Sequence, residues 1–498
     1  MSVGSSVATI LAQARVIANI EYLPLFPRLA NAAVSYVTYL WQTVWPSKLA
    51  VYYPHLGMQL PAWRALVACA IVIAISVAVF LRRRKQPYLL VGWFWFVGTL
   101  VPVIGIVQVG TQAHADRYTY LPAIGIYLMV AWGAAAWARQ WRRGRVFLGA
   151  AGSIIIIGLV VVAIKQTLFW RTPEIFWNHT LAVTRHNEVA HNGVGFIYLT
   201  QGRTEDAIAH FYQALKIRPD YIDAAANLGL AFSRTGRAGE AIAVLREVVK
   251  SRPRDARSRS FLANALMLDG RKEEAIEQFR SVLEMEPGNA EARFKLGEAL
   301  AQTGRLEEGI TQLRTATELR PRQVEVHVAL GNALVDLGRI DEGITSFQRA
   351  LEVQPDFADA QYNLGISLFL KKRFPEAIAA WWRAYEIQPE LANLRANLAW
   401  LLATFPEAGV RDGARAFALA KELEARTPDD PLVYRSLGAA YAETGRFDDA
   451  ITVAKKAMEL ARTRGDTVLP GVLEQDMISY RAGKPLRDLS QTGSETTP

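Results

Sequence analysis

The sequence has almost no cysteine: Cys69 is the only one in 498 residues. A single cysteine excludes a disulfide framework and cysteine-based zinc sites. The seven histidines are scattered along the chain without the spacing of metal ligands. We therefore expect no metal site and no cofactor.

Acidic residues are scarce in the first third of the chain. Residues 1–170 hold only two of the 47 acidic residues, Glu21 and Asp116, but 14 of the 56 basic ones, so their net charge is +12. The rest of the chain holds 42 basic and 45 acidic residues, a net charge of −3. The basic residues lie beside apolar runs and no nucleic-acid motif occurs, so orientation in a membrane explains them better than nucleic-acid binding. We also expect no cleavable signal peptide, because Arg15 and Glu21 interrupt the apolar run that it requires.

Long apolar runs are what this first part of the chain does contain. Uncharged runs of about 18 residues match the roughly 30 Å hydrocarbon core of a bilayer, in which a helix pairs its own backbone groups. We therefore expect residues 63–165 to form four transmembrane helices. The runs are Ala65–Leu81, Tyr88–Val109, Leu121–Ala138 and Val146–Ile164.

Two basic loops set the expected orientation. One basic cluster, at 82–85, separates the first two runs, and another, at 139–145, separates the last two. Basic loops stay in the cytoplasm, so the 110–120 loop and everything after Ile164 are expected outside. The prediction is a multi-pass protein of the inner (cytoplasmic) membrane, with the remainder of the chain on the periplasmic or lumenal side.

Residues 1–62, which precede these runs, are expected to lie along the membrane and not to cross it. Residues 1–62 are expected to form an amphipathic helix and a loop on the outer face of the membrane. Proline interrupts any continuous helix in this segment, at Pro46, Pro54 and Pro61.

Beyond residue 187 the sequence repeats itself every 34 residues. Proline recurs with this period at Pro219, Pro253, Pro287, Pro321, Pro355 and Pro389. Glycine followed by a basic residue recurs with the same period at Gly202, Gly236, Gly270, Gly304 and Gly338. Together with small and large apolar residues at fixed positions, these are the consensus positions of the tetratricopeptide repeat (TPR), a pair of antiparallel helices that stacks on its neighbours.

The predicted fold class is all-α: a multi-pass transmembrane helix bundle followed by a TPR α-solenoid superhelix. We expect a junction at 166–187 and about eight repeats over 188–464. The seventh repeat is five residues longer than the others, and the extra length fits a turn around Phe405–Gly413. Residues 465–498 are expected to form a C-terminal cap and a disordered tail.

A TPR solenoid binds a protein or peptide along the groove lined by the first helix of each repeat. The alternative for each groove side chain is that it is only solvated or packs internally. The candidate partner-binding residues are Asn192, Arg234, Asn264, Glu298, Asn332, Tyr362 and Trp400.

A second candidate site lies in the loop between the second and third apolar runs. Asp116, Arg117, Tyr118 and Tyr120 fall at the expected membrane surface. The arginine fork suits a lipid phosphate at headgroup level. The alternative is an Asp116–Arg117 ion pair that only fixes the hairpin.

Three stretches resemble the transmembrane-and-TPR O-mannosyltransferases and their bacterial relatives. They are 45–55 (WPSKLAVYYPH), 115–122 (ADRYTYLP) and 169–177 (FWRTPEIFW). The resemblance implies a C-type glycosyltransferase, which moves a sugar from a polyprenyl-phosphate carrier to an acceptor on the outer face. It also implies that Asp116 and Arg117 face the carrier phosphate and that the TPR groove presents the acceptor.

The chain departs from this family at its front. The essential acidic residues of the family lie in a first outer loop, but the only acid before Trp63 is Glu21. A glycosyl transfer needs a carboxylate to activate the acceptor. We therefore expect a membrane-anchored TPR protein that binds a partner on the outer face and is a catalytically incomplete relative of these enzymes. The alternative is a glycosyltransferase fragment that is active with a missing N-terminal membrane part.

Overall fold

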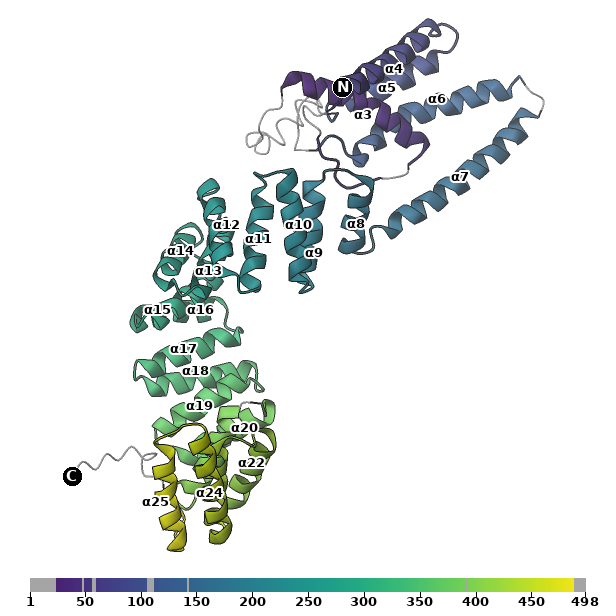
Figure 1. Ribbon diagram of the computed structural model, residues 1–498. Coiled ribbons are helices and arrows are strands. Elements are labelled where there is room, and N and C mark those ends of the chain that lie inside the picture. The colour runs from purple at the N-terminus through teal and green to yellow at the C-terminus, as the bar shows by residue number, and fades with distance from the viewer. Residues whose placement is uncertain are drawn as a thin grey trace. The chain divides into compact units, whose positions relative to one another are not determined.

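The computed structural model describes residues 24–46, 49–55, 60–104, 112–140, 143–390 and 392–487. The fold is all-α, as predicted (Figure 1), and the only pairing of extended segments in the described part is an isolated bridge between Pro54 and Gln112. The chain divides into two compact units, Met1–Leu268 and Asp269–Pro498.

The first unit begins with the apolar helices. They are α3 (Leu25–Val44), α4 (Ala62–Leu81), α5 (Pro87–Leu100), the short 3₁₀ helix η2 (Asp116–Thr119), α6 (Tyr120–Ala138) and α7 (Gly144–Leu168). Three segments of the described chain are long and apolar enough to cross a membrane: Ala62–Leu81, Asp116–Ala138 and Gly144–Leu168. They coincide with the first, third and fourth of the expected spans.

The second expected span is shorter than its apolar run. Helix α5 has 14 residues and is about 21 Å long at 1.5 Å per residue, too short for a roughly 30 Å core. The helix stops just before Pro102, which has no backbone N–H to donate to the preceding turn. A turn follows as far as Ile104, and 105–109 lies outside the described residues.

Helix packing leaves apolar surface facing outward. Helices α5 and α6 cross closely at Gly92 and Gly125, where a Cβ on Gly125 would lie 2.2 Å from the Gly92 carbonyl oxygen. Small residues of this kind allow the close helix contacts common in membranes. On α7, four successive isoleucines, Ile154–Ile157, are each at least 61% exposed. A helix that is apolar on its outward faces is suited to lipid.

Helix α3 packs against the other apolar helices. It packs along α4, and its buried face includes Asn31, Ser35 and Tyr39, spaced by four residues, and Tyr36, three residues before Tyr39, as the period of an amphipathic helix requires. The Tyr36 hydroxyl donates to the Val97 carbonyl on α5 at 2.8 Å. The expected helix within 1–62 is therefore present from Leu25, and residues 1–23 lie outside the described part.

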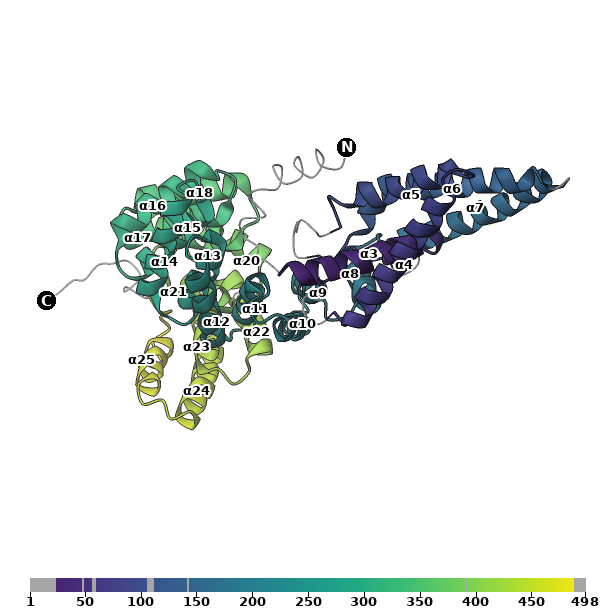
Figure 2. The ribbon, with the colours of Figure 1, turned by 90° about the horizontal axis from the view of Figure 1, so that it is seen from above.

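The first unit ends with the junction and the first repeats. These helices are α8 (Pro173–Val183), α9 (Glu188–Thr200), α10 (Thr204–Ile217), α11 (Ile222–Arg234), α12 (Ala238–Ser251) and α13 (Ala256–Leu268). Figure 2 shows the same unit from above. The first helices of successive repeats, α9, α11 and α13, contact one another and so form one continuous face.

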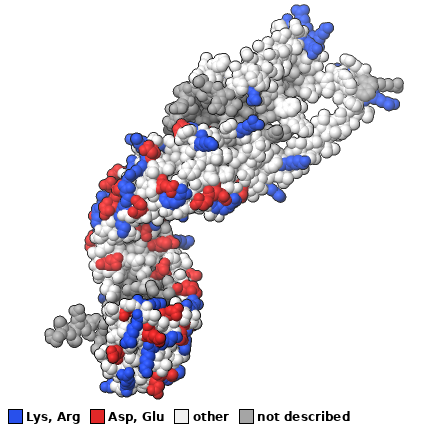
Figure 3. Space-filling model, viewed as in Figure 1, with Lys and Arg blue, Asp and Glu red and all other residues white. Residues whose placement is uncertain are grey.

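The second unit contains the remaining repeats. Its helices are α14 (Lys272–Met285), α15 (Ala290–Gln302), α16 (Leu306–Leu319), α17 (Val324–Asp336), α18 (Ile340–Val353), α19 (Ala358–Leu370), α20 (Phe374–Ile387), α21 (Ala392–Thr404), α22 (Gly413–Arg426), α23 (Pro431–Glu443), α24 (Phe447–Thr463) and α25 (Leu469–Arg481). The first helices again touch, α15 with α17, α17 with α19, and α21 with α23. Acidic and basic side chains are dense over the repeats and sparse over the apolar helices (Figure 3).

The turn between the two helices of a repeat uses a left-handed residue. Gly338 has φ +84°, and the following Arg339 N–H donates to the Leu334 carbonyl at 2.8 Å, which closes the helix end. In the next repeat Lys372 occupies this position at φ +60°, with the same bond from Arg373. In the sixth repeat a lysine therefore takes the left-handed conformation at the position where the period has glycine in the earlier repeats.

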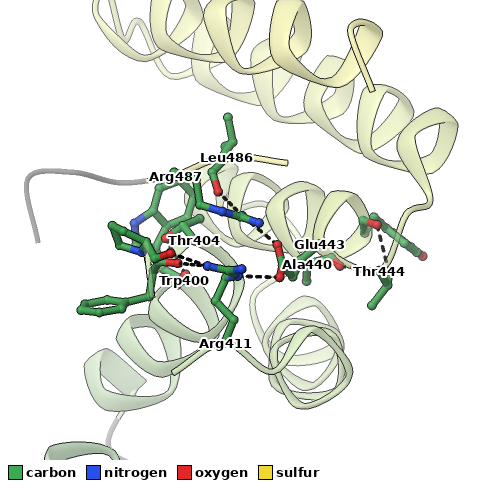
Figure 4. A network of polar contacts seen from close by, with 11 residues as sticks. Trp400, Thr404, Arg411, Ala440, Glu443, Thr444, Leu486 and Arg487 are labelled. Atoms are coloured by element: carbon green, nitrogen blue, oxygen red, sulfur yellow. Dashed lines mark hydrogen bonds and ion pairs between the residues drawn. The ribbon is translucent and has the colours of Figure 1, made fainter. Parts of the chain in front are cut away.

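The insert in the seventh repeat connects α21 to α22, as predicted. Arg411 donates from Nη1 to the Phe405 and Pro406 carbonyls, at 2.8 and 2.6 Å, and from Nε to Glu443 at 2.7 Å. Arg487 binds the other oxygen of Glu443 at 2.7 Å (Figure 4). One carboxylate therefore holds both the insert and the segment after α25.

The C-terminal region forms the expected cap. Helix α25 contacts α24 and buries Leu473, Met477 and Tyr480. The predicted disordered tail lies, from residue 488 on, outside the described residues.

Candidate functional site

The loop before α6 is built around the carboxylate of Asp116. Both of its oxygens lie 3.0 Å from the Tyr53 hydroxyl, which donates to the carboxylate. Gln42 Nε2 donates to Oδ1 at 3.1 Å, and the Ala50 N–H donates to Oδ2 at 3.2 Å. Arg117 points elsewhere: its exposed guanidinium lies 5.1 Å from the centre of the Tyr118 ring. Among the described residues Asp116 forms no ion pair, so the alternative of an Asp116–Arg117 pair is wrong.

Aromatic rings pack beside this carboxylate. The His114 ring stacks on Tyr53, with centroids 4.0 Å apart, and meets Tyr39 edge-on at 5.6 Å. The Tyr39 hydroxyl donates to the Ala115 carbonyl at 3.2 Å and accepts from the Ala115 N–H at 3.0 Å. We call Tyr39, Gln42, Tyr53, His114 and Asp116 the outer-loop cluster.

Burial controls the protonation of this cluster. It lowers the pKa of His114 to about 4, so the ring is neutral at pH 7, and the buried Nε2 atom has no hydrogen-bond partner among the residues that the structure describes. Burial and the charge of Asp116 raise the pKa of Tyr53, so its hydroxyl stays protonated and remains a donor. The cluster therefore holds one carboxylate among neutral donors.

A short loop, residues 49–55, connects this cluster to the repeats. The Leu49 carbonyl accepts from Gln166 Nε2 at 3.3 Å and lies 3.0 Å from His179 Nε2 on α8. The Tyr52 carbonyl accepts from Asn187 Nδ2, at the start of α9, at 3.1 Å. We call 49–55 the linking loop, because it contacts the outer-loop cluster on one side and the junction on the other.

The other predicted residues of the outer loop differ in exposure. Tyr118 is partly buried, its hydroxyl accepts from Gln112 Nε2 at 3.1 Å, and its ring packs on the core of the apolar helices. Tyr120 is 79% exposed at the first position of α6. Arg117 and Tyr120 are thus accessible, whereas Asp116 and Tyr118 support the loop.

Sequence reasoning missed three members of the outer-loop cluster. Gln42, Tyr53 and Tyr39 lie 63 to 76 positions before their partners at 115 and 116. Two features of the sequence could have pointed to these residues: the aromatic run before Pro46, which contains Tyr39, and the 45–55 stretch, which contains Tyr53. Neither feature indicates which residues the side chains contact.

Groove candidates in the first unit have mixed roles. Asn192 Oδ1 accepts from Asn227 Nδ2 at 2.9 Å, and Asn227 Oδ1 accepts from Arg257 at 3.4 Å, so polar side chains of three successive first helices form a ladder. Arg234 instead donates to the Leu199 carbonyl at 2.8 Å and braces the preceding repeat. Asn264 is exposed on α13.

Groove candidates in the second unit include one converging pair. Glu298 pairs with Lys295 at 2.8 Å, and Asn332 is exposed on α17. Tyr362 and Trp400, from consecutive repeats, line one pocket of about 210 Å³. The residues lining this aromatic pocket are Tyr362, Ile366, Trp381, Leu394, Asn397, Trp400 and Leu401.

Known protein families match the repeat region. Models described as tetratricopeptide repeat match residues 198–265, 266–332, 328–392 and 433–468. They coincide with the helix pairs described above, and confirm the TPR interpretation of the period.

Curated relatives match part of the chain. The Drosophila melanogaster protein O-mannosyl-transferase Tmtc3 is 29% identical over 143 residues, which is 28% of this chain and 15% of that protein. Mouse protein O-mannosyl-transferase TMTC1 is 25% identical over 170 residues, 33% of this chain and 18% of that protein. The matched segments span less than a fifth of the relatives' length.

Solved TPR structures are also similar over part of the chain. MamA from MSR-1 is 25% identical with a TM-score of 0.31, covering 34% of this chain and 97% of MamA. PilF of Pseudomonas aeruginosa is 19% identical with a TM-score of 0.38, covering 43% of this chain and 96% of PilF. With the family models and the curated relatives, the chain is a TPR protein that resembles the protein O-mannosyl-transferases of the Tmtc group.

Proposed function

We propose that this protein is anchored in a membrane by its apolar helices and binds a protein or peptide partner in its TPR groove. One observation carries the proposal: within each unit first helices of successive repeats contact one another, as α9, α11 and α13 do and as α15, α17 and α19 do, and Tyr362 of α19 and Trp400 of α21 line one pocket. An extended segment can lie along such a face, with its side chains entering pockets between repeats.

The anchor is supported by three helices of membrane length with outward apolar side chains. The proposed location is the inner membrane, with the repeats on the periplasmic or lumenal side. The support is the basic cluster that follows α4, where Arg82, Arg84 and Lys85 are exposed, because such clusters stay in the cytoplasm.

Cysteine labelling tests the orientation, since the chain has only Cys69 to remove. In a Cys69→Ser background, Lys484→Cys places a thiol at an exposed position after α25, and Arg84→Cys places one in the basic loop. In cells with a permeabilised outer envelope, a membrane-impermeant maleimide is expected to label the first variant and not the second. The reverse pattern would put the repeats in the cytoplasm.

A lipid phosphate is the proposed ligand of the outer loop, and the resemblance points to polyprenyl phosphate. Arg117 and Tyr120 are exposed where an apolar span begins, which is headgroup level. Asp116 already accepts hydrogen bonds from three groups, so its proposed role is to position the loop that presents Arg117. Vesicles with and without polyprenyl phosphate test this: Arg117→Ala is expected to remove any preference for the phosphate-containing vesicles.

A sugar-transfer role is the second candidate. It is favoured by the linking loop, which belongs to the first of the three stretches that resemble the O-mannosyltransferases, binds Asp116 of the second, and lies beside His179, whose ring stacks on Phe169 of the third. The assay is transfer from a polyprenyl-phosphate sugar donor by the purified chain, alone and with a separately expressed membrane part from a Tmtc relative. Turnover by the chain alone would make it an enzyme, and absence of turnover in both settings would leave the binding function.

A further inference from the structure

We propose that the aromatic pocket binds one aromatic side chain of an extended peptide that lies across α19 and α21. This inference rests on the proposed groove-binding function and names the chemistry of one subsite within it. Two of the seven groove candidates, Tyr362 and Trp400, meet there although they lie on different repeats.

The size of the pocket selects a side chain over a whole small molecule. Its volume of about 210 Å³ is below the roughly 300–1,000 Å³ typical of small-molecule sites. Three rings line it, those of Tyr362, Trp381 and Trp400, and offset or edge-to-face ring pairs contribute about 0.5–1.5 kcal/mol beyond simple burial. These walls favour an aromatic occupant over an aliphatic one.

The pocket is formed before anything binds. Trp381 Nε1 donates to the Tyr362 carbonyl at 3.1 Å, which fixes the indole against α19. Gly365 makes room for this ring, because a Cβ there would lie 2.4 Å from Trp381 Cδ1. A preformed pocket spares the peptide the free energy of ordering its walls.

The surrounding charges exclude a basic occupant. None of the seven residues that line the pocket is acidic or basic, so a charged occupant of either sign would meet no opposite charge in the lining. The guanidinium of Arg435 lies 4.3 Å from the centre of the Trp400 ring, and its Nε binds Asp476 at 2.8 Å. A lysine or arginine entering the pocket would meet this positive charge and the already covered face of Trp400. The occupant is therefore neutral.

The peptide backbone also has a partner at this place. Asn397 is exposed among the lining residues, and a side-chain amide can both donate to and accept from one peptide group. The side chain in the pocket would thus be accompanied by main-chain bonds, as in other extended-peptide complexes.

Earlier repeats do not offer the same site. At the position of Tyr362, the fourth and fifth repeats carry Phe294, which is 5% exposed, and Val328, which is 9% exposed. At the position of Trp400, the fifth and sixth repeats carry Asn332 and Ile366. The aromatic subsite is therefore specific to the contact between the sixth and seventh repeats.

The test uses the full chain in detergent micelles and two probes. A phage-displayed library of random 12-residue peptides reports on the groove, and N-acetyl-tyrosinamide, observed by saturation-transfer NMR, reports on the pocket alone. N-acetyl-lysinamide is the matched charged probe. The expected result is enrichment of one aromatic residue among the selected peptides, and signal from the tyrosine probe but not from the lysine probe.

Three variants separate the outcomes. Trp400→Ala removes a wall, Ile366→Trp fills the pocket without deleting any packing, and Leu370→Ala changes an exposed apolar residue of α19 that does not line it. We expect the first two to weaken peptide binding at least tenfold and the third to leave it unchanged. Selected peptides without an aromatic residue, or ones that bind the filled variant equally well, would overturn the subsite and keep the groove function. Failure of both peptides and tyrosine probe to bind the wild type would overturn both proposals.

Discussion

The hydroxyl of Tyr53 and the carboxylate of Asp116 are 3.0 Å apart, although 63 positions separate them in the chain. The contact ties the linking loop to the segment that opens α6. The neighbouring Arg117 takes no part in it and remains exposed. Two adjacent residues of one motif thus differ in their surroundings, since Asp116 is held by three hydrogen-bond donors and Arg117 is exposed.

Removing the Tyr53 hydroxyl should weaken this region. Tyr53→Phe deletes the donor to a partly buried carboxylate, and a hydrogen bond to a charged group contributes about 2 kcal/mol. We expect the thermal unfolding midpoint of the apolar helices, followed by circular dichroism in micelles, to fall by several degrees. Tyr120→Phe is the control, because this tyrosine is 79% exposed at the same end of α6. Equal midpoints for the two variants would show that the contact is unimportant for stability.

Replacing the left-handed lysine should stabilise the second unit. Lys372 has φ +60°, a conformation that glycine adopts without strain, so Lys372→Gly is expected to add about 0.5–1 kcal/mol. The matched control is Lys371→Gly, where φ is −85° and glycine gains nothing from the conformation. Thermal unfolding should rank the proteins with Lys372→Gly highest and Lys371→Gly lowest. A lower midpoint for Lys372→Gly than for the wild type would contradict this.

The shared carboxylate of Glu443 should be important for the last repeats. Glu443→Gln keeps the shape of the side chain but removes the charge that Arg411 and Arg487 both bind at 2.7 Å. Because Glu443 is 14% exposed and Arg411 15%, we expect a loss of about 2 kcal/mol.

Limited proteolysis should then detect earlier cleavage in the insert around Phe405–Gly413. Glu376→Gln is the control, since it breaks an exposed pair with Arg373 and should leave the cleavage pattern unchanged. Identical digestion of the two variants would show that the network does not hold the insert.

Protonation of His114 should lower the stability of the outer-loop cluster in acid, whereas Asp116, whose pKa burial raises to about 6, acts with the opposite sign and is present both in the wild type and in a His114 variant. Burial lowers the pKa of this histidine from its ordinary value of 6.5 to about 4, so between these two values the unfolded chain binds a proton that the folded chain does not. Stability is then fully present above pH 6.5 and is lost as the pH falls toward 4, by about 3 kcal/mol in all.

The measurement compares wild type with His114→Phe between pH 4 and 7.5. The difference between their unfolding midpoints should change with pH and become constant above pH 6.5. His191 and His210, whose Nδ1 atoms lie 3.1 Å apart and whose pKa values burial also lowers, act with the same sign in both proteins and cancel in the difference. A difference independent of pH would assign the acid sensitivity to other groups.

The sequence allowed the repeats to be predicted because their signals are local. Each closing proline and each left-handed glycine acts on its own turn, so a period of 34 residues was enough to place the helix pairs. The left-handed conformation of Lys372 was not predicted, because the residue type at that position does not indicate a positive φ. The second span was predicted to be longer than α5, because the apolar run continues past Pro102 whereas the helix ends at Leu100.

The contacts within the candidate sites were not predictable in the same way. Tyr53 and Asp116 meet because the linking loop pairs through its backbone with the segment at 112 and 113, and no local pattern encodes that meeting. The groove face was predicted from the repeat frame, but the pocket is also lined by Trp381, which comes from the second helix of the sixth repeat and donates to the Tyr362 carbonyl.

The linking loop offers its carbonyl oxygens, those of Leu49 and Tyr52, to side chains of the junction. Any amino acid at these two positions would supply the same oxygen, whereas the donors Gln166, His179 and Asn187 have few chemical substitutes. Over evolutionary time the two partners should therefore diverge at unequal rates. Related sequences are expected to vary more at 49 than at the positions of the amide and the imidazole that face its carbonyl oxygen.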